Sequence, residues 1–426
     1  MPPFEASAPH DPYTALRLPE FRRLLLARVA LTVASQIQGV TVAYQIYKLT
    51  DDALALGLIG LAEAIPSIVV SLYAGHLADT VRRKRIIVGS VALLVLCALA
   101  LLVLTQAAPV PTPGAAAAQP LLIPGLYGVL FVSGIARGFL GPALFAFMPQ
   151  VLPDRSFLAN AITWNSTTWQ AASVVGPALG SLLFAKLGLS AAYAVTLALA
   201  VAALLLWLTI PGRPLPPLEG ERLRLGESIA SGVRFIFNNQ IVLAALSLDL
   251  FAVLFGGAVA LLPVFVDKVL HTAPETLGYL RAAPAIGSVA MAVALTYFPL
   301  RRRAGVKLLW AVAGFGLATI GFALSTSLAL SLFLLFLTGV FDSVSVIVRS
   351  TLIHTYTPEY MKGRVSAVNN IFIGSSNEIG AFESGAAARL MGTVPSVVFG
   401  GIMTLVVVAV TAWKADRLRE LESGTK

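Results

Sequence analysis

Twelve apolar stretches, each close to the length that crosses a lipid bilayer, occupy most of this 426-residue chain. A membrane-spanning helix needs roughly 20 predominantly apolar residues. The stretches lie at 22–46, 54–78, 86–106, 122–148, 157–184, 189–210, 241–266, 276–298, 306–325, 329–353, 365–390 and 396–413. Only 12% of the residues are charged, too few to cover a soluble fold, which carries about 25%. We therefore predict an all-α integral membrane protein with twelve transmembrane helices.

The basic residues are concentrated in alternate connections between these stretches. Most of the 30 Lys and Arg residues lie in the tails and the even-numbered connections, whereas the odd-numbered connections hold only Lys48, Lys186 and Lys268. Because positively charged loops are retained in the cytoplasm, both termini are predicted to be cytoplasmic. The dispersed charges also argue against nucleic acid as a partner, despite the net charge of +9, since such binding needs one gathered basic patch.

A polar segment at 211–240 divides the chain near its middle. It opens with a proline-rich turn and continues as a predicted amphipathic helix on the inner membrane surface. The residues expected on the apolar face of that helix are Leu225, Ile229, Val233, Ile236 and Phe237.

Weak internal repetition supports two related halves. Gly134, Pro153, Asn165 and Gly180 recur in the same order and at one constant offset. Their counterparts are Gly339, Pro358, Asn370 and Gly385. We predict a cytoplasmic tail at 1–20, a six-helix half at 21–210, a linker at 211–240, a second six-helix half at 241–414 and a tail at 415–426.

The most specific local pattern is Gly75-His-Leu-Ala-Asp79-Thr-Val-Arg82-Arg83-Lys84-Arg85, between the second and third stretches. Gly75 permits close helix packing, and Asp79 can bind the positive N-terminus of another helix. The segment resembles the loop signature of the major facilitator superfamily, with Gly75, Asp79, Arg83 and Lys84 among the matching positions. Thr80 and Arg82 depart from the signature. The alternative is a basic loop that only sets topology.

Further segments resemble the same family. Arg137 with Gly141 looks like its fourth-helix arginine pattern, which is linked with proton coupling. Gly176-Pro177-Ala-Leu-Gly180 is similar to the glycine-proline motif of its drug/proton antiporters, which implies export. The alternative for this motif is a kinked, tightly packed helix with no bearing on direction. The second half contains Asp249-Leu-Phe-Ala-Val-Leu-Phe-Gly-Gly, Arg281-Ala-Ala-Pro and Ser376-Asn377-Glu378. These segments look like the enterobactin-exporter-like branch, which includes bacterial siderophore and multidrug exporters.

Besides Arg22, Arg23 and Lys307 at the first residues of their stretches, ten charged residues fall inside the predicted helices, where an ionisable group is costly unless it faces a cavity or a partner. They are Arg28, Glu63, Arg137, Asp249, Arg281, Asp342, Arg349, Glu378, Glu383 and Arg389. Asp342 and Arg349 are two turns apart on one helix face, which suits a cavity-lining stripe but is too far for a direct bond. Asp249 can meet either Arg281 or Arg349 in the interior.

A carboxylate that exchanges an arginine partner for a proton would couple proton entry to substrate exit. The candidates are Asp249, Glu63 and Glu378, in that order, with Glu383 as a further cavity charge. Asp342 and the arginines Arg137, Arg281 and Arg349 are the expected partners. The alternative is a set of static ion pairs that hold helices together.

Polar and aromatic residues suggest a substrate cavity, and other chemistry is not indicated. Asn165, Asn370, Trp164 and Trp169 are candidate substrate ligands, although such asparagines equally often bond helix to helix. None of the four histidines has a second ligand at metal spacing, and no phosphate-binding glycine loop or hydrolytic motif is present. We therefore expect no metal, no cofactor, no use of ATP and no enzymatic activity.

The resemblance implies the twelve-helix major facilitator fold, with two pseudo-symmetric six-helix halves around a central cavity. The favoured function is proton-coupled export of an amphipathic drug-like or siderophore-like molecule by alternating access. We expect a monomer in the bacterial inner membrane, with protons, a small-molecule substrate and membrane lipids as partners. The alternatives are an importer of a small metabolite, a lipid or lysophospholipid flippase whose cavity opens sideways, and a receptor or scaffold that transports nothing.

Overall fold

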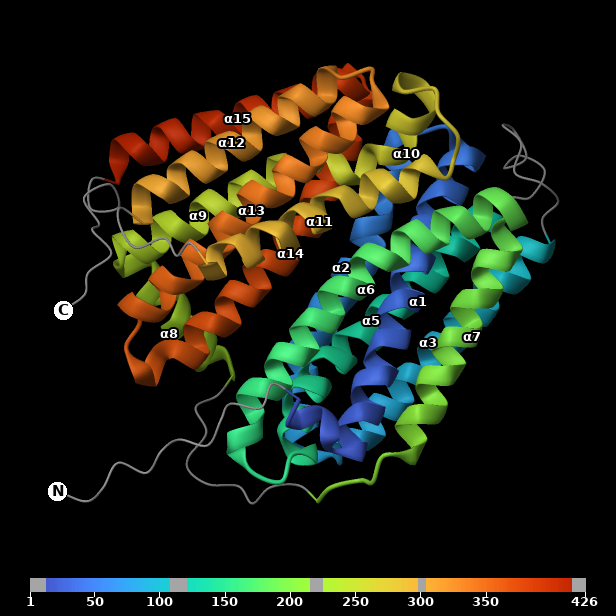
Figure 1. The fold of residues 1–426 in the computed structure, drawn as a ribbon, viewed down its shortest axis with the longest axis vertical. Helices are drawn as coiled ribbons and strands as arrows, with labels where there is room; N and C mark the ends of the chain where they lie inside the picture. The colour runs from blue at the N-terminus through green and yellow to red at the C-terminus, as the bar shows by residue number, and fades with distance from the viewer. Residues whose placement is uncertain (1–12, 108–120, 215–224, 298–303, 416–426) are drawn as a thin grey trace.

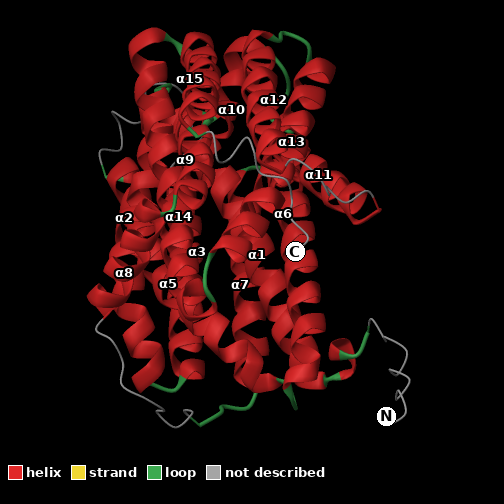
Figure 2. Ribbon diagram, turned by 90° about the vertical axis from the view of Figure 1, so that its left-hand side faces the viewer, coloured by secondary structure: helices red, strands yellow, loops and turns green. Residues whose placement is uncertain are grey.

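The computed structural model describes residues 13–107, 121–214, 225–297 and 304–415, and these residues form helices without strands. Twelve long helices make up the molecule (Figures 1 and 2), and in Figure 1 those of the second half slant across the view while those of the first half run more steeply. Those of the first half are α1 (Pro19–Thr50), α2 (Ala53–Thr80), α3 (Arg83–Ala107), α5 (Leu122–Phe147), α6 (Leu158–Leu187) and α7 (Leu189–Thr209). Those of the second half are α9 (Gln240–Phe255), α11 (Thr276–Tyr297), α12 (Ala304–Leu324), α13 (Leu328–Tyr356), α14 (Glu359–Met391) and α15 (Thr393–Lys414).

Eleven of the described helical segments are long and apolar enough to cross a membrane. The remaining long helix, α14, is diluted by Glu378, Glu383 and Arg389, yet its 33 residues complete the predicted set of twelve. Helix α7 shows why these segments are helical, because small residues such as Ala192, Ala200 and Ala203 are buried against neighbours while the rest of its surface is also apolar.

The two halves form separate bundles that meet along two helix pairs. In Figure 1 the blue-to-green half and the yellow-to-red half diverge from a common end near the short helix α10 (Leu262–Val264). Helix α2 packs against α14, and α6 packs against α11, across the interface between the halves. The interface therefore consists of one pair of crossing helices on each side of the molecular centre.

A shared turn gives further support to the internal repetition. Gly188 joins α6 to α7 with φ 85°, and Gly392 joins α14 to α15 with φ 91°. Both dihedrals lie in the region that residues with a Cβ rarely adopt, so glycine is required at each turn. A glycine turn thus connects the last two helices of each half, α6 to α7 and α14 to α15.

The seventh apolar stretch, which we expected to be one continuous helix, is interrupted. Helix α9 ends at Phe255, and the chain continues through a 3₁₀ turn (Ala258–Leu261), α10 and a π-helical turn (Phe265–Val269). A Cβ on Gly256 would lie 2.7 Å from the ring of Phe315, and one on Gly257 would lie 2.7 Å from the carbonyl oxygen of Gly380. The backbone can approach α12 and α14 this closely only because both residues lack a side chain.

The linker contains the predicted amphipathic helix, α8 (Leu225–Asn238). Ile236 is buried against Met361 and Val365 of α14, whereas Phe237 is 63% exposed. Consecutive helical residues point about 100° apart, so Phe237 is directed away from the contact that Ile236 makes with α14. The side chains of Leu225 and Ile229 lie outside the described part of the chain.

Candidate functional site

Four charged side chains from four helices gather where the two halves meet. Arg137 of α5 donates a hydrogen bond from Nη1 to Oε2 of Glu63 on α2 at 2.7 Å. Glu378 of α14 reaches across to α2, where a Cβ on Gly60 would lie 2.9 Å from its carboxylate oxygen. Arg281 of α11 interacts electrostatically with both carboxylates. We call Glu63, Arg137, Arg281 and Glu378 the central charge cluster, which takes one acid and one base from each half.

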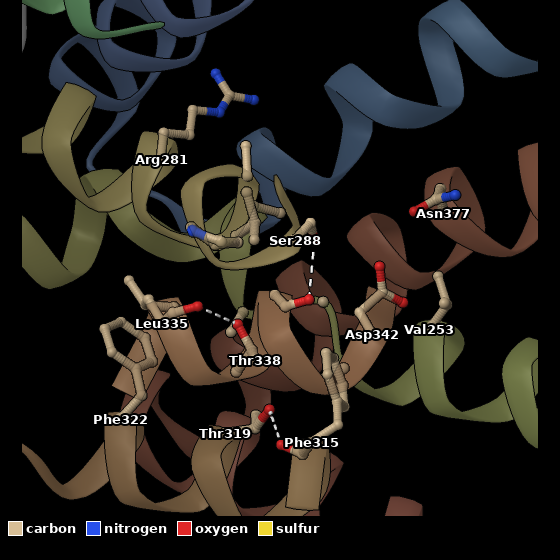
Figure 3. Close-up of a pocket in the computed structure, with 18 of the residues that line it drawn as sticks. Val253, Arg281, Ser288, Phe315, Thr319, Phe322, Leu335, Thr338, Asp342 and Asn377 are labelled. Carbon is tan, nitrogen blue, oxygen red and sulfur yellow. Dashed lines mark hydrogen bonds between the residues drawn. The ribbon is translucent and has the colours of Figure 1, made fainter. Parts of the chain in front are cut away.

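Two adjoining cavities border the central charge cluster. The smaller, of about 160 Å³, is lined by Glu63, Arg281 and Glu378. The larger, of about 380 Å³, lies mainly in the second half and also reaches Arg281. Figure 3 shows Asp342 of α13 and Asn377 of α14 on one side of this larger cavity, with Arg281 at its far end. The cluster therefore borders space that the protein's own side chains do not fill.

A second ion pair is enclosed within the second half. Asp249 of α9 contacts Arg349 of α13 through its Oδ2 atom and the Nη1 atom of the arginine. The exposed fraction is 5% for Asp249 and 3% for Arg349. Of the two arginines that the sequence offered as partners for Asp249, the structure thus pairs it with Arg349. Asp342 lines the larger cavity instead.

The first half contains a pocket of its own, of about 280 Å³. Arg28 and Arg137 line it together with Trp169, whose ring is half exposed. Polar groups of Thr32 and Gln36 complete its wall. We call it the arginine pocket.

The predicted substrate ligands are not all brought together. Trp169 lines the arginine pocket, but Trp164 packs beside Tyr13 with ring centroids 5.9 Å apart, in the core of the first half. The Oδ1 atom of Asn165 is buried and accepts no hydrogen bond from a described residue. The side chain of Asn370 lies outside the described residues, although its backbone belongs to α14. Glu383 is half buried and contacts the hydroxyl of Ser384 at 3.5 Å, and it lines none of the three cavities.

The glycine-proline segment of α6 packs against α1. A Cβ on Gly176 would lie 2.5 Å from Cβ of Gln36, and one on Gly180 would lie 2.7 Å from Cγ1 of Val40. Pro177 stands inside the same helix. These contacts show close packing of the kind that small residues allow, and the implied direction of transport stays a prediction.

The basic residues at the start of α3 hold two helix ends. Arg83 donates to the carbonyl oxygen of Ala146 at 2.9 Å, and Lys84 donates to that of Leu208 at 3.0 Å. These carbonyls belong to the last turns of α5 and α7, whose negative ends favour a cation. Gly75 and Asp79 fall in the last turns of α2, but their side chains lie outside the described residues.

An ionic latch that sequence reasoning missed joins the halves at the end marked by α10. Lys48 pairs with Asp267 at 2.6 Å, Lys268 pairs with Asp51 at 2.7 Å, and Arg389 pairs with Asp52 at 3.2 Å. We call these six residues the latch. All three ion pairs that join the two halves between described residues lie here. The signal in the sequence is the acidic residues close to the two lysines, Asp51 and Asp52 after Lys48 and Asp267 before Lys268.

Reversing one charge of the latch is expected to open this end of the molecule. Lys48→Glu and Asp267→Lys should each expose the small cavity, because repulsion replaces an attraction worth about 0.2–1 kcal/mol for a partly exposed pair. The measurement is the labelling rate of a cysteine at the buried residue Ala43, which lines that cavity, in a Cys97→Ala background. A membrane-impermeant maleimide should label each single variant several-fold faster than the parent.

The double variant Lys48→Glu/Asp267→Lys restores opposite charges and serves as the matched control. It should return the labelling rate toward that of the parent. Equal rates in all four proteins would show that the latch does not hold this end closed.

Comparison with known proteins gives one consistent result. The sequence model of the Major Facilitator Superfamily matches residues 24–381. The enterobactin exporter EntS of Shigella boydii serotype 18 is 28% identical over 390 residues, covering 91% of this chain and 90% of that protein. The enterobactin exporter EntS of Escherichia coli O81 shows the same identity and coverage over 391 residues.

Solved structures share the architecture at low sequence identity. The nucleoside transporter NupG (D323A mutant) superposes with a TM-score of 0.72 and 12% identity, covering 92% of this chain and 99% of that one. A bacterial homologue of the iron transporter ferroportin in an inward-facing state gives 0.71 and 15%, covering 95% and 99%. A bacterial homologue of the human lysosomal transporter Spinster, inward-facing and unoccupied, gives 0.68 and 17%, covering 94% and 98%.

Proposed function

The chain belongs to the major facilitator superfamily, and from that premise we propose that it is a proton-coupled exporter of amphipathic small molecules that works by alternating access. Its family and relatives make it a multi-pass membrane transporter of small molecules. The relatives named as enterobactin exporters support outward transport of a siderophore-like or drug-like molecule. Proton coupling is supported by the central charge cluster.

The central charge cluster is the observation that carries the proposal. A carboxylate at this depth must have a cationic partner or bind a proton. Glu63 has Arg137 at 2.7 Å, whereas Glu378 makes no ion pair with a described residue and feels Arg281 and Arg137 only through space. Glu378 is therefore the carboxylate whose negative charge is stabilised less by a direct partner.

Division of the cluster between the halves would link protonation to movement. Glu63 and Arg137 belong to the first half, and Arg281 and Glu378 belong to the second. When the halves rock, each carboxylate keeps the base of its own half and loses or gains the base of the other. The affinity of both carboxylates for protons then depends on conformation, which is the requirement for coupling.

The latch supports an assignment of the present conformation. The rule of positive cytoplasmic loops assigns the latch end to the periplasm and the Arg83 end to the cytoplasm. A molecule latched at its periplasmic end is in an inward-facing state, the state named for two of the solved neighbours. Substrate would then enter from the cytoplasm or the inner leaflet.

Transport in everted membrane vesicles tests the proposal. With the lumen acidified, vesicles that contain the protein should accumulate a fluorescent lipophilic dye, and the lumen should become less acidic as the dye enters. Nigericin, which collapses the pH gradient, should abolish the accumulation. Dye movement that ignores the gradient contradicts proton coupling, and proton-driven movement of solutes out of the vesicles identifies an importer.

A flippase is the second candidate, because a large apolar groove opens on the side of the bundle. It measures about 890 Å³ and lies between α6, α11 and α13, with Val175, Ile286 and Phe333 in its wall. All of its lining residues are uncharged, so it suits an acyl chain. The same vesicles, loaded with a fluorescent phospholipid, separate the two functions. Protein-dependent lipid movement between leaflets without dye accumulation favours the flippase.

A further inference from the structure

The arginine pocket lies in the first half, and Arg137 connects it to the central charge cluster through Glu63, which lines the small cavity. Arg28 is roughly 13 Å along α1 from Pro19, and Arg137 is roughly 15 Å along α5 from Phe147. Both distances are measured from the same, cytoplasmic end of the bundle. The two guanidinium groups therefore border the route that a molecule from the cytoplasm would follow.

The charges of the arginine pocket do not balance. Arg137 is paired with Glu63, but Arg28 makes no ion pair with a described residue, and the described lining of the pocket includes no carboxylate. Glu63 neutralises Arg137, so the positive charge of Arg28 has no counterpart among the described residues of the pocket. A guanidinium inside the membrane is costly unless it faces a partner or a water-filled cavity, and Arg28 faces a pocket whose described lining contains no carboxylate.

The other walls define what kind of anion fits. Trp169 offers an aromatic face, and Leu31, Leu140 and Leu144 add apolar surface. Thr32 supplies a hydroxyl group beside the two arginines. A volume of about 280 Å³ is small for a ligand pocket and suits a group of one or two aromatic rings.

We propose that the arginine pocket binds the anionic, aromatic end of the transported molecule. Arg28 holds the anion through its planar fork of N–H donors, Arg137 supports it from α5, and Trp169 stacks on the ring. This inference rests on the proposed export function and narrows its substrates from amphipathic molecules in general to aromatic anions. An anionic lipid headgroup shares part of this chemistry, and the test separates the two.

Three probes with the same rings and different charge test the proposal. Radiolabelled 1-naphthoate, 1-naphthylmethylamine and 1-naphthylmethanol are dialysed to equilibrium against the full-length protein in phosphatidylcholine nanodiscs, without a pH gradient. Naphthoate should bind most tightly. Arg28→Gln should weaken naphthoate binding by about tenfold or more, as expected for loss of a charge-assisted contact, and leave naphthylmethanol unchanged.

Two further variants keep the test decisive. Arg22→Gln removes an exposed arginine from the same helix and should leave binding of all three probes unchanged. Trp169→Ala should weaken all three several-fold through lost stacking, which gives a second result if Arg28→Gln does not fold. Nanodiscs containing phosphatidylglycerol should leave naphthoate binding unchanged, and competition there would assign the pocket to a lipid headgroup instead.

The outcomes distinguish the inference from the function on which it rests. Equal affinity for the anion and the cation, or unchanged naphthoate binding in folded Arg28→Gln, overturns the anion site while proton-driven transport in vesicles still stands. Specific naphthoate binding without proton-driven transport supports the site and refutes the proposed coupling.

Discussion

Glu63→Gln and, independently, Glu378→Gln are expected to reduce proton-driven dye accumulation to the level of protein-free vesicles. Glutamine keeps the size and the hydrogen-bond acceptor of glutamate, so Arg137 can still be bonded and the helices can still pack. The amide cannot take up and release a proton, so the cycle loses its coupling step. Exchange of labelled for unlabelled substrate at equal pH should continue, because it requires binding and movement only.

The matched control for these variants is Glu275→Gln. Glu275 precedes α11 at the latch end, lines neither cavity of the cluster and uses its backbone carbonyl, not its carboxylate, to bond Ser181. It should accumulate dye as the parent does. Full uphill accumulation in both Glu63→Gln and Glu378→Gln would remove the central charge cluster as the coupling site.

Asp249→Leu is expected to destabilise the protein by about 3–5 kcal/mol, because it leaves the charge of Arg349 buried without a partner. The expected readouts are a large loss of folded protein after extraction and a lowered midpoint of thermal unfolding in detergent. Asp249→Leu/Arg349→Met removes both charges and should recover most of the lost stability, since an apolar pair of similar volume often replaces a buried ion pair without cost.

The double variant also decides the role of Asp249 in transport. Both partners belong to the second half and are almost fully enclosed, so rocking of the halves does not part them. We therefore rank Glu63 and Glu378 ahead of Asp249, which the sequence alone placed first. The double variant should transport dye uphill. Folded protein without uphill transport would return Asp249 to the coupling site.

The helices could be predicted from sequence because lipid imposes a local rule. Every backbone N–H and C=O in the hydrocarbon region must be bonded within its own segment, so a run of apolar residues suffices to predict a helix. The break after Phe255 follows a different rule. Its residues are as apolar as their neighbours, and the reason for the break lies in contacts with Phe315 and Gly380, which are distant in sequence.

The site was predictable as a set of residues but not as a set of pairs. The cost of burying charge singled out Glu63, Arg137, Arg281 and Glu378 without any knowledge of packing. Which acid meets which base depends on how helices cross, and two pairings, with Arg281 or with Arg349, were open for Asp249. Arg28 was recognised as an intramembrane charge, but its pocket is formed by residues of four helices that only the fold brings together.

The latch makes the protein sensitive to the salt concentration outside the cell. Its carboxylates and cationic groups are partly open to solvent, and dissolved ions screen such charges over a Debye length of about 8 Å at physiological ionic strength. The rule of positive cytoplasmic loops predicts that the latch faces the periplasm, where the ionic strength follows the external medium. High external salt would weaken the three ion pairs of the latch, while the buried charges near Arg281 stayed unscreened. Salinity would then shift the equilibrium between the inward-facing and outward-facing states without altering the proton chemistry.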